Sequence, residues 1–270
     1  MVHIRADEAG NANQNTNGIG WMVLLWSVME KAPEYSVLDL TLTAGDTGTT
    51  GTALGSSRSD MYYCPTRGFR RSTGTEVFRG SCPDYVFVGV TSLTLDSALT
   101  ASSVNGGSRW HSSLAPYMLG ALIPSSPRQV VTSPTGGTQV ILRSRVTIGG
   151  VSDGMSYTAL VGEKHLNPDH VGAAWFDNPY NPGHIASGQP GGVRIAGLGL
   201  AQRPDNPKAD PAGAVNGTTD PYYYTYGSWH PGITQFAFGD ARVQAVKNYA
   251  TTDTLHAMSG RGDGLPFNLP

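Results

Sequence analysis

The residues that could carry acid–base or nucleophilic chemistry include a serine, a histidine and an aspartate near the C-terminus. Residues 227–246 read GSWHPGITQFAFGDARVQAV, so Ser228, His230 and Asp240 fall within one segment. Hydrolases use these residue types because the histidine takes the proton of the serine and the aspartate orients the imidazole. Ser228 and His230 are two residues apart on an extended segment without the strand–turn–helix elbow that activates a serine. We therefore expect no catalytic triad.

We expect His230 and Asp240 to mark a loop and a hairpin instead. Gly239 and Asp240 separate two apolar runs, TQFAF and RVQAV, and a glycine followed by a polar residue in this position is typical of a two-residue hairpin. Gly239 would supply the positive φ of a type II′ turn, and Asp240 would lie on that turn. The His230 imidazole would then bind backbone or a carboxylate in a structural role.

A second group of candidate metal ligands is Glu163, His165, Asp169 and His170. Such a linear run beside Pro168 seldom achieves the geometry that a metal requires, and a solvated polar loop is the simpler interpretation. The chain also lacks a Gly-Lys dipeptide and the His-Glu-x-x-His and Gly-x-Ser-x-Gly signatures. We expect no catalytic residue, no metal ligand and no cofactor, so the protein is predicted not to be an enzyme.

Two cysteines, Cys64 and Cys82, enclose 17 residues. This spacing suits a disulfide, which would contribute about 3 kcal/mol of stability through loop closure. We favour that interpretation over two free buried thiols or a metal-binding pair. The enclosed loop holds a local basic patch that could contact an anionic polymer, made up of Arg67, Arg70, Arg71 and Arg79.

The composition indicates a turn-rich, mostly β chain. Charged residues make up 14% of the 270 residues, compared with about 25% in a typical soluble domain. Glycine occurs 35 times, which is about twice its usual share of about 7%. The formal net charge of −2 gives no reason to expect a nucleic acid or an anionic membrane as a partner. The low lysine content and the cysteine pair favour an exported protein.

The hydrophobic pattern predicts an α+β fold in a single domain covering residues 1–270. Residues 19–30 form an apolar helix, ended by Pro33, that packs on a mainly antiparallel sheet. Residues 1–17 are a polar extension, and residues 202–221 are a Pro/Asp/Asn-rich loop insertion. The strand-like segments, rich in β-branched and aromatic residues, are residues 85–95, 138–148, 156–163, 192–200, 234–238 and 242–246.

An aromatic stretch precedes His230. Tyrosine and tryptophan suit surfaces that are half apolar and half wet, so these rings could cover the end of the sheet, form a subunit interface or stack on sugars. The residues concerned are Tyr222, Tyr223, Tyr224, Tyr226 and Trp229.

Four segments, in order, resemble a large bacterial family of prepilin-like proteins of unknown function, whose C-terminal signature is His-x9-Asp-Gly. HPGITQFAFGDARV keeps His230, Pro231, Gly232 and Asp240 but has Ala241 in place of the signature glycine. VSDGMSYTALVGE resembles the family's Asp-Gly-x-Ser-Asn-Thr strand that ends in Glu, and carries Asp153, Gly154, Ser156 and Glu163. YYCPTR with DYVFVG resembles its Cys-Pro-Ser-Asp segment and following strand, and GWMVLLWSVMEK resembles its Gly-Trp-x-x-x-L-L-P-Y-x-E-Q helix.

The resemblance implies an exported protein with a pseudopilin-like head and no known catalytic residue. Family members usually begin with a prepilin cleavage signal and a long hydrophobic helix, so we expect a membrane connection only through an N-terminal segment missing here. We expect a structural subunit of an extracellular or cell-surface assembly, acting as a homo-oligomer or filament. The alternatives are a module that binds polysaccharide or an anionic polymer and, less favoured, a metal-dependent hydrolase.

Overall fold

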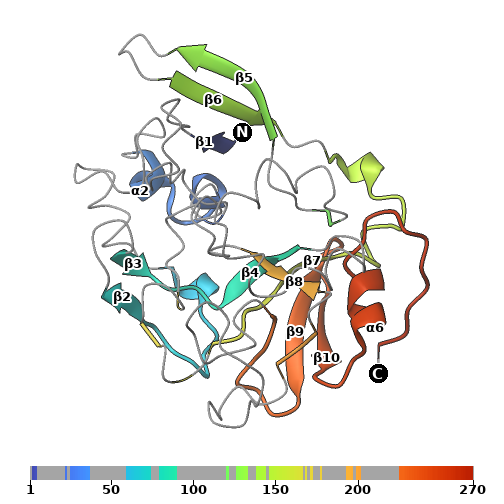
Figure 1. Cartoon of the computed structure of the whole chain (residues 1–270). Helices are drawn as coiled ribbons and strands as arrows, with labels where there is room; N and C mark the ends of the chain where they lie inside the picture. The colour runs from blue at the N-terminus through green and yellow to red at the C-terminus, as the bar shows by residue number, and fades with distance from the viewer. Residues whose placement is uncertain are drawn as a thin grey trace, which may run out of the picture.

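The protein is described by a computed structural model in which a five-stranded sheet forms the centre (Figure 1). The structure describes residues 2–4, 22, 25–36, 59–73, 79–89, 120–121, 126–132, 138–143, 146–166, 168, 171–172, 177, 193–196, 199–201 and 225–269. The sheet order is β10 (Val243–Lys247), β9 (Ile233–Phe238), β7 (Ala159–Glu163), β4 (Tyr85–Gly89) and β8 (Val193–Ile195). The first four strands are antiparallel to their neighbours, whereas β8 runs parallel to β4. The predicted α+β class is confirmed.

Two smaller sheets complete the described strands. The three-stranded sheet has the order β1 (Val2–Ile4), β6 (Thr138–Arg143) and β5 (Ser126–Thr132), and lies at the top of Figure 1, apart from the main sheet. The third is the pair β2 (Arg71–Thr73) and β3 (Arg79–Ser81). Part of the expected polar extension, Val2–Ile4, is thus a strand. The predicted insertion at residues 202–221 lies outside the described residues.

The core lies between the main sheet and the C-terminal helix α6 (Thr252–Ala257). Strand β9 alternates half-buried and buried residues, so Phe236 and Phe238 point into the core with Val246 of β10. Leu255 and Met258, from α6 and its end, pack on this cluster. The Thr251 side chain caps α6 by accepting a hydrogen bond from the Thr254 amide.

The N-terminal apolar segment differs from the single helix that the sequence predicted. Its described part contains the 3-10 helix η1 (Leu25–Val28) and the short helix α2 (Ala32–Ser36). Pro33 lies in the first turn of α2, where its missing N–H needs no partner, so it does not end a helix here. Of the described helices, none has the length and apolar character of a bilayer span.

The β9–β10 hairpin is confirmed, but its turn is not type II′. Ala241 donates a backbone hydrogen bond to Phe238, and Ala241 itself has φ +66°. This is a three-residue loop in which a turn is followed by a left-handed residue, a position that favours glycine. Gly239 has another role, because a Cβ there would lie 2.5 Å from the Met155 Cε atom.

Replacing Ala241 with glycine should therefore stabilise the protein. A left-handed alanine costs about 1–2 kcal/mol, partly offset by the larger entropy that glycine loses on folding. We expect Ala241→Gly to raise the free energy of unfolding by about 0.5–1 kcal/mol in urea denaturation. The matched variant Gly239→Ala should lower it through the Met155 contact, and equal effects of the two changes would contradict this account.

Candidate functional site

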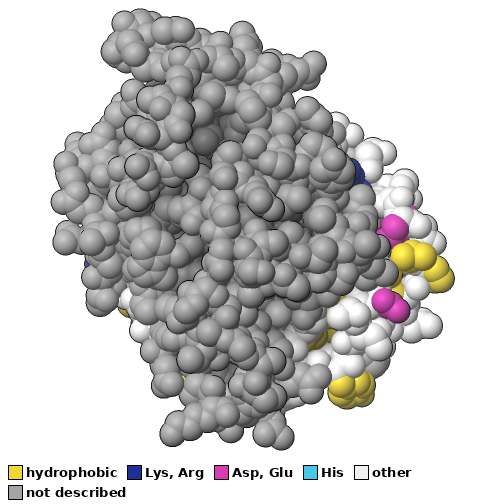
Figure 2. Space-filling model, viewed as in Figure 1, with side chains coloured by type: hydrophobic (Ala, Val, Ile, Leu, Met, Phe, Trp, Pro, Cys, Tyr) yellow, Lys and Arg dark blue, Asp and Glu magenta, His cyan; other side chains and the backbone are white. Residues whose placement is uncertain are grey.

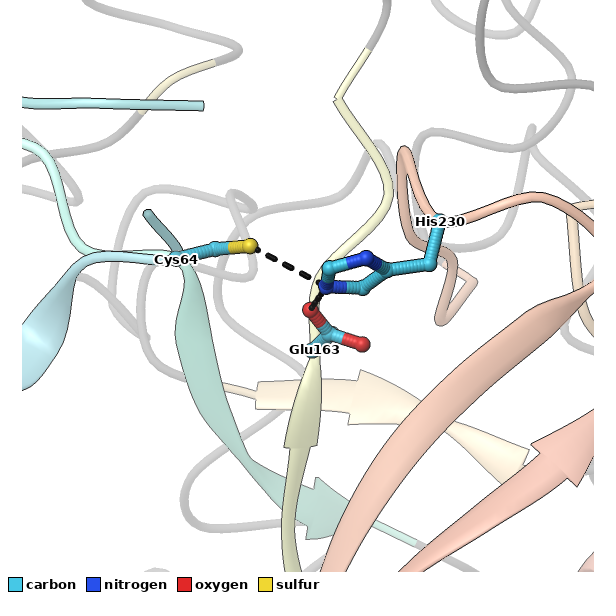
Figure 3. A group of neighbouring side chains, drawn as sticks. All are labelled: Cys64, Glu163 and His230. Carbon is cyan, nitrogen blue, oxygen red and sulfur yellow. Dashed lines mark hydrogen bonds and ion pairs between the residues drawn. The ribbon is translucent and has the colours of Figure 1, made fainter. Parts of the chain in front are cut away.

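Three chemically different side chains meet at one end of the main sheet: Cys64, Glu163 and His230 (Figure 3). The Cys64 Sγ atom lies 3.3 Å from Nε2 of His230. The Glu163 Oε1 atom lies 3.5 Å from the same nitrogen. All three candidate ligand atoms lie within 4.8 Å of one another. Cys64 and Glu163 are buried, whereas the His230 side chain is 26% exposed.

Cys64 reaches this point from the loop that follows the 3-10 helix η2 (Asp60–Tyr62). Its amide donates a 2.7 Å hydrogen bond to Oδ2 of Asp84, and its carbonyl accepts hydrogen bonds from the amides of Arg67 and Gly68. The backbone on both sides of the thiol is thus fixed by buried hydrogen bonds, which set the direction of the side chain.

Glu163 is the last residue of β7, which lies between β4 and β9. Its second oxygen, Oε2, accepts a 2.8 Å hydrogen bond from the amide of Gln235 on β9. A buried carboxylate needs such donors to replace water. The other oxygen, Oε1, is left facing His230.

His230 lies in the turn that precedes β9. Its amide donates to the Ser228 hydroxyl at 2.9 Å, and Gly232 completes the turn with φ +73°. Trp229 anchors the turn from the other side, because its indole Nε1 donates to the Leu166 carbonyl at 2.9 Å. Pro231 is exposed at the tip.

A buried network of charges lies behind the Cys64 loop, and Asp84 is at its centre. The Asp84 carboxylate is fully buried and pairs with Arg67 at 2.9 Å and with Arg70 at 2.7 Å. Arg67 also donates to the carbonyls of Lys164 and Gly227, at 2.8 and 3.0 Å. One guanidinium therefore joins the Cys64 loop to the end of β7 and to the segment that carries His230.

Asp177 forms the second half of this network. It accepts hydrogen bonds from Arg70 and from the Lys164 amine, the latter at 2.9 Å. Burial raises the pKa of Asp177, but the charges of Lys164 and Arg70 outweigh this effect and hold the pKa below its usual value. For Lys164, burial is the larger effect, and it lowers the pKa of the amine despite the neighbouring Asp177.

Tyr85 of β4 lies beside the three-residue cluster and pairs directly with Glu163 across the strands. Burial raises the pKa of Tyr85 to about 12, and charges at Cys64, Glu163 and Asp84 raise it further, whereas Arg67 lowers it. Ionisation of the Tyr85 hydroxyl is therefore disfavoured at this end of the sheet.

The geometry distinguishes two kinds of chemistry for the cluster. In a thiol protease-like relay, the histidine uses one ring nitrogen for the nucleophile and the other for the orienting acid. Here the thiol and the carboxylate both face Nε2, so Glu163 cannot orient the imidazole while Nε2 takes the Cys64 proton. A sulfur, an oxygen and a nitrogen atom that converge on one point are instead the arrangement of ligand atoms in a metal-binding site.

A comparison with protein-family models matches residues 4–253 to the family described as protein of unknown function (DUF1559). The chain belongs to this family. No curated protein and no solved structure shows significant similarity to the chain. Three of the four segments that resembled prepilin-like proteins each supply one member of the cluster: the Cys-Pro segment supplies Cys64, the strand ending in Glu supplies Glu163, and the His-Pro-Gly turn supplies His230.

The hydrolase triad considered from the sequence is not assembled in this DUF1559 member. Ser228 is buried and binds the backbone of His230, whereas Asp240 is exposed in the β9–β10 turn. The Asp240 carboxylate accepts from the Arg242 amide at 3.0 Å, and this bond holds the pKa of Asp240 below its usual value. The second candidate run is divided as well. Glu163 joins Cys64 and His230, His165 is buried nearby, and Asp169 and His170 lie outside the described residues.

The disulfide favoured from the cysteine spacing does not form in this structure. Cys64 and Cys82 are both buried and neither belongs to a disulfide, as in the alternative of two thiols. The reason is the direction of Cys64, whose sulfur faces His230. The amide of Cys82 donates to the Arg70 carbonyl at 3.1 Å, which fixes the second cysteine in the wall of the charge network.

The expected binding surfaces are also placed differently. Arg67 and Arg70 are buried and paired with aspartates, so they do not form a surface patch for an anionic polymer, whereas Arg71 is exposed. Tyr226 lies in the core and donates to the Arg194 carbonyl. Trp229 is half-buried. The remaining members of the predicted aromatic platform lie outside the described residues, namely Tyr222, Tyr223 and Tyr224.

The other motif residues have structural contacts. Asp153 accepts hydrogen bonds from the amides of Asp263 and Gly264, at 2.8 and 3.1 Å, and so ties its turn to the C-terminal segment. Gly154 has φ +92° in that turn. The Ser156 carbonyl accepts from Arg242 at 2.6 Å, which attaches the same turn to the β9–β10 hairpin.

Sequence reasoning missed Asp84, Asp177 and Lys164. The available signal was the low charge content, because arginines in a chain with few charges need partners when they are buried. The position of Asp84, directly before a strand and 20 residues after Cys64, was a further signal. No signal in the sequence pointed to Asp177 as the partner of Arg70, because the two residues are 107 positions apart.

Removing the charge of Asp84 should strongly destabilise the protein. Asp84→Asn leaves Arg67 and Arg70 without their shared carboxylate, and breaking a buried pair typically costs about 3–5 kcal/mol. We expect a loss of this size in urea denaturation. The exposed change Asp240→Asn is the matched control and should cost less than about 1 kcal/mol. Equal losses would show that Asp84 is not the centre of the fold.

The low pKa of Asp177 predicts a loss of stability in acid. Because its pKa is depressed in the folded state, the contribution of Asp177 is fully present above the unfolded-state pKa of about 3.9 and is lost as the pH falls below it. The melting temperature of the wild type should therefore decrease steeply as the pH is lowered below about 4. Asp177→Asn should be less stable at neutral pH and show a shallower acid dependence, and an unchanged slope would contradict this role.

Proposed function

We propose that the protein is a non-enzymatic structural subunit of an extracellular or cell-surface assembly, built by self-association as a homo-oligomer or filament. The prepilin-like resemblance supports this function. Membership of the DUF1559 family does not by itself specify a function, because the function of that family is unknown. Residues that suggested catalysis or polymer binding contribute instead to stability: Ser228, Arg67 and Arg70 are all buried and hydrogen-bonded within the chain. The proposal includes export from the cell.

The observation that carries the proposal is the edge of the main sheet at β10, to which no further strand is paired among the described residues. Phe238 donates to the Arg242 carbonyl and Asn248 donates to the Gly232 carbonyl. Antiparallel strands alternate their bonded residues, so Gln244 and Val246 direct their backbone groups toward β9. The backbone groups of Val243 and Ala245 then point to the edge of the sheet, as does the amide of Lys247, whose carbonyl accepts a hydrogen bond from the Ala250 amide at 2.8 Å.

The side chains at this edge would allow β10 to pair with the same strand of a second copy. Val243 is 61% exposed, and Tyr249 just beyond the strand is 63% exposed. Lysine often blocks edge pairing, but the Lys247 amine lies over the Tyr249 ring, 5.5 Å from its centroid. At the right of Figure 2, over the part of the molecule where Figure 1 draws α6, the C-terminal segment and β10, a few hydrophobic side chains lie among acidic ones. An antiparallel edge is self-complementary, because one two-fold axis can relate two copies of it.

The test compares the assembly of the wild type with that of an edge variant. Ala245→Pro removes an outward N–H without removing a bond to β9, and Ala245→Thr is the matched control that keeps the N–H. We expect the wild type to form dimers with rising concentration in sedimentation, because a two-fold edge contact closes after two copies. A filament in negative-stain microscopy would require a second contact surface. Ala245→Pro should remain monomeric with a melting temperature close to that of Ala245→Thr.

Two outcomes would count against this function. A wild type that stays monomeric at all concentrations, in material isolated from its native surface, would overturn the structural-subunit proposal. Binding of that monomer to a glycan array, lost on Trp229→Ala, would instead favour the polysaccharide alternative. Assembly that persists in Ala245→Pro would keep the proposed function and exclude β10 as its interface.

A further inference from the structure

We propose that Cys64, Glu163 and His230 bind one divalent transition-metal ion, and that Zn²⁺ is the ion they fit best. The sequence alone did not bring these three ligands together, because they come from segments up to 166 residues apart. The inference is independent of the proposed function, since a metal could bind to a monomer or to an assembled subunit.

Two of the three distances between the ligand atoms match the edges of a tetrahedral site. Zinc–sulfur bonds of about 2.3 Å and zinc–nitrogen or zinc–oxygen bonds of about 2.0–2.2 Å place sulfur about 3.5 Å from nitrogen or oxygen, and nitrogen and oxygen about 3.4 Å apart. The observed separations are 3.3 Å for Cys64 Sγ to His230 Nε2 and 3.5 Å for Glu163 Oε1 to the same nitrogen. The third separation, from the Cys64 sulfur to the Glu163 carboxylate, lies within 4.8 Å. An ion that binds all three ligands would draw these two side chains together until sulfur and oxygen are about 3.5 Å apart.

The donor set selects the class of metal. A thiolate with an imidazole suits zinc and related transition metals, whereas magnesium and calcium prefer oxygen ligands alone. One thiolate and one carboxylate together carry two negative charges, which balance a divalent cation. Without a cation, two potential anions and a histidine share a mostly buried site, and a metal relieves this arrangement.

The surroundings hold two of the ligands in position. The free oxygen of Glu163 is held by the Gln235 amide at 2.8 Å, and the Cys64 backbone is held by the Asp84 carboxylate at 2.7 Å. Outer partners of this kind orient ligands in established metal sites. His230 is the one ligand with an exposed side chain, at 26%, so the fourth position opens toward its side, where water can complete the coordination.

The experiment uses the full chain, reduced and treated with a chelator that is then removed. Cobalt(II) is titrated first, because a thiolate ligand gives a sulfur-to-cobalt charge-transfer absorption and a tetrahedral site gives intense visible bands. Zinc is then added as a competitor. We expect one cobalt per chain, with both signals present, and full displacement by zinc.

Four variants assign the ligands. Cys64→Ser should remove the charge-transfer absorption, and Glu163→Gln, which keeps the size of the side chain, should weaken binding more than about 100-fold, the upper end of the effect of outer partners. His230→Ala should weaken it similarly. Cys82→Ser is the matched control, because it replaces the other buried thiol, and it should bind cobalt as the wild type does. Circular dichroism of each variant checks that it is folded.

Several results would overturn the site. One is the absence of cobalt binding by the folded wild type. Another is binding that survives both Glu163→Gln and His230→Ala, since the ion would then lie elsewhere. A mass measurement showing that the native protein carries a Cys64–Cys82 bridge would also exclude it, because the sulfur could not then act as a thiolate ligand.

Discussion

A carboxylate that has no access to water must be surrounded by donors, and Asp84 imposes this requirement at the centre of the protein. Its two oxygens accept hydrogen bonds from the Cys64 amide and from the guanidinium groups of Arg67 and Arg70. Its own backbone carbonyl accepts from the Lys164 amide at 2.8 Å. Since the donors lie on different parts of the Cys64 loop or, for Lys164, directly after β7, the position of that loop against the sheet follows from one buried residue.

The class of the fold and the main strands were predictable because they depend on local patterns. Residues 234–238 and 242–246 alternate or cluster apolar side chains around a turn, and this pattern is sufficient to predict the β9–β10 hairpin. The type of that turn was not predictable, because Gly239 is required by contact with Met155, a residue far away in sequence. Likewise, no local signal divides the N-terminal apolar segment into η1 and α2.

The candidate site shows the same difference between local patterns, which the sequence reveals, and long-range contacts, which it does not. His230, Glu163 and Cys64 were each singled out from the sequence, but as members of separate motifs with separate structural roles. Their meeting point depends on the pairing of β4 with β7 and of β7 with β9, and on the buried arginines that hold the loops. The arginines themselves were assigned to the surface because charged residues are usually exposed, and only the carboxylates at positions 84 and 177 reverse that expectation.

The span of the Arg67 contacts also bears on how the chain folds. Arg67 binds the carbonyl of Gly227, 160 residues further along the sequence, as well as that of Lys164. Contacts between such distant segments slow folding, because the chain must lose the entropy of a long loop before they form. During synthesis, the interior around residues 64–84 therefore stays incomplete until the last quarter of the protein has emerged. Partly made chains expose apolar strands and unpaired charges, a state that is prone to aggregation and makes them natural substrates for chaperones.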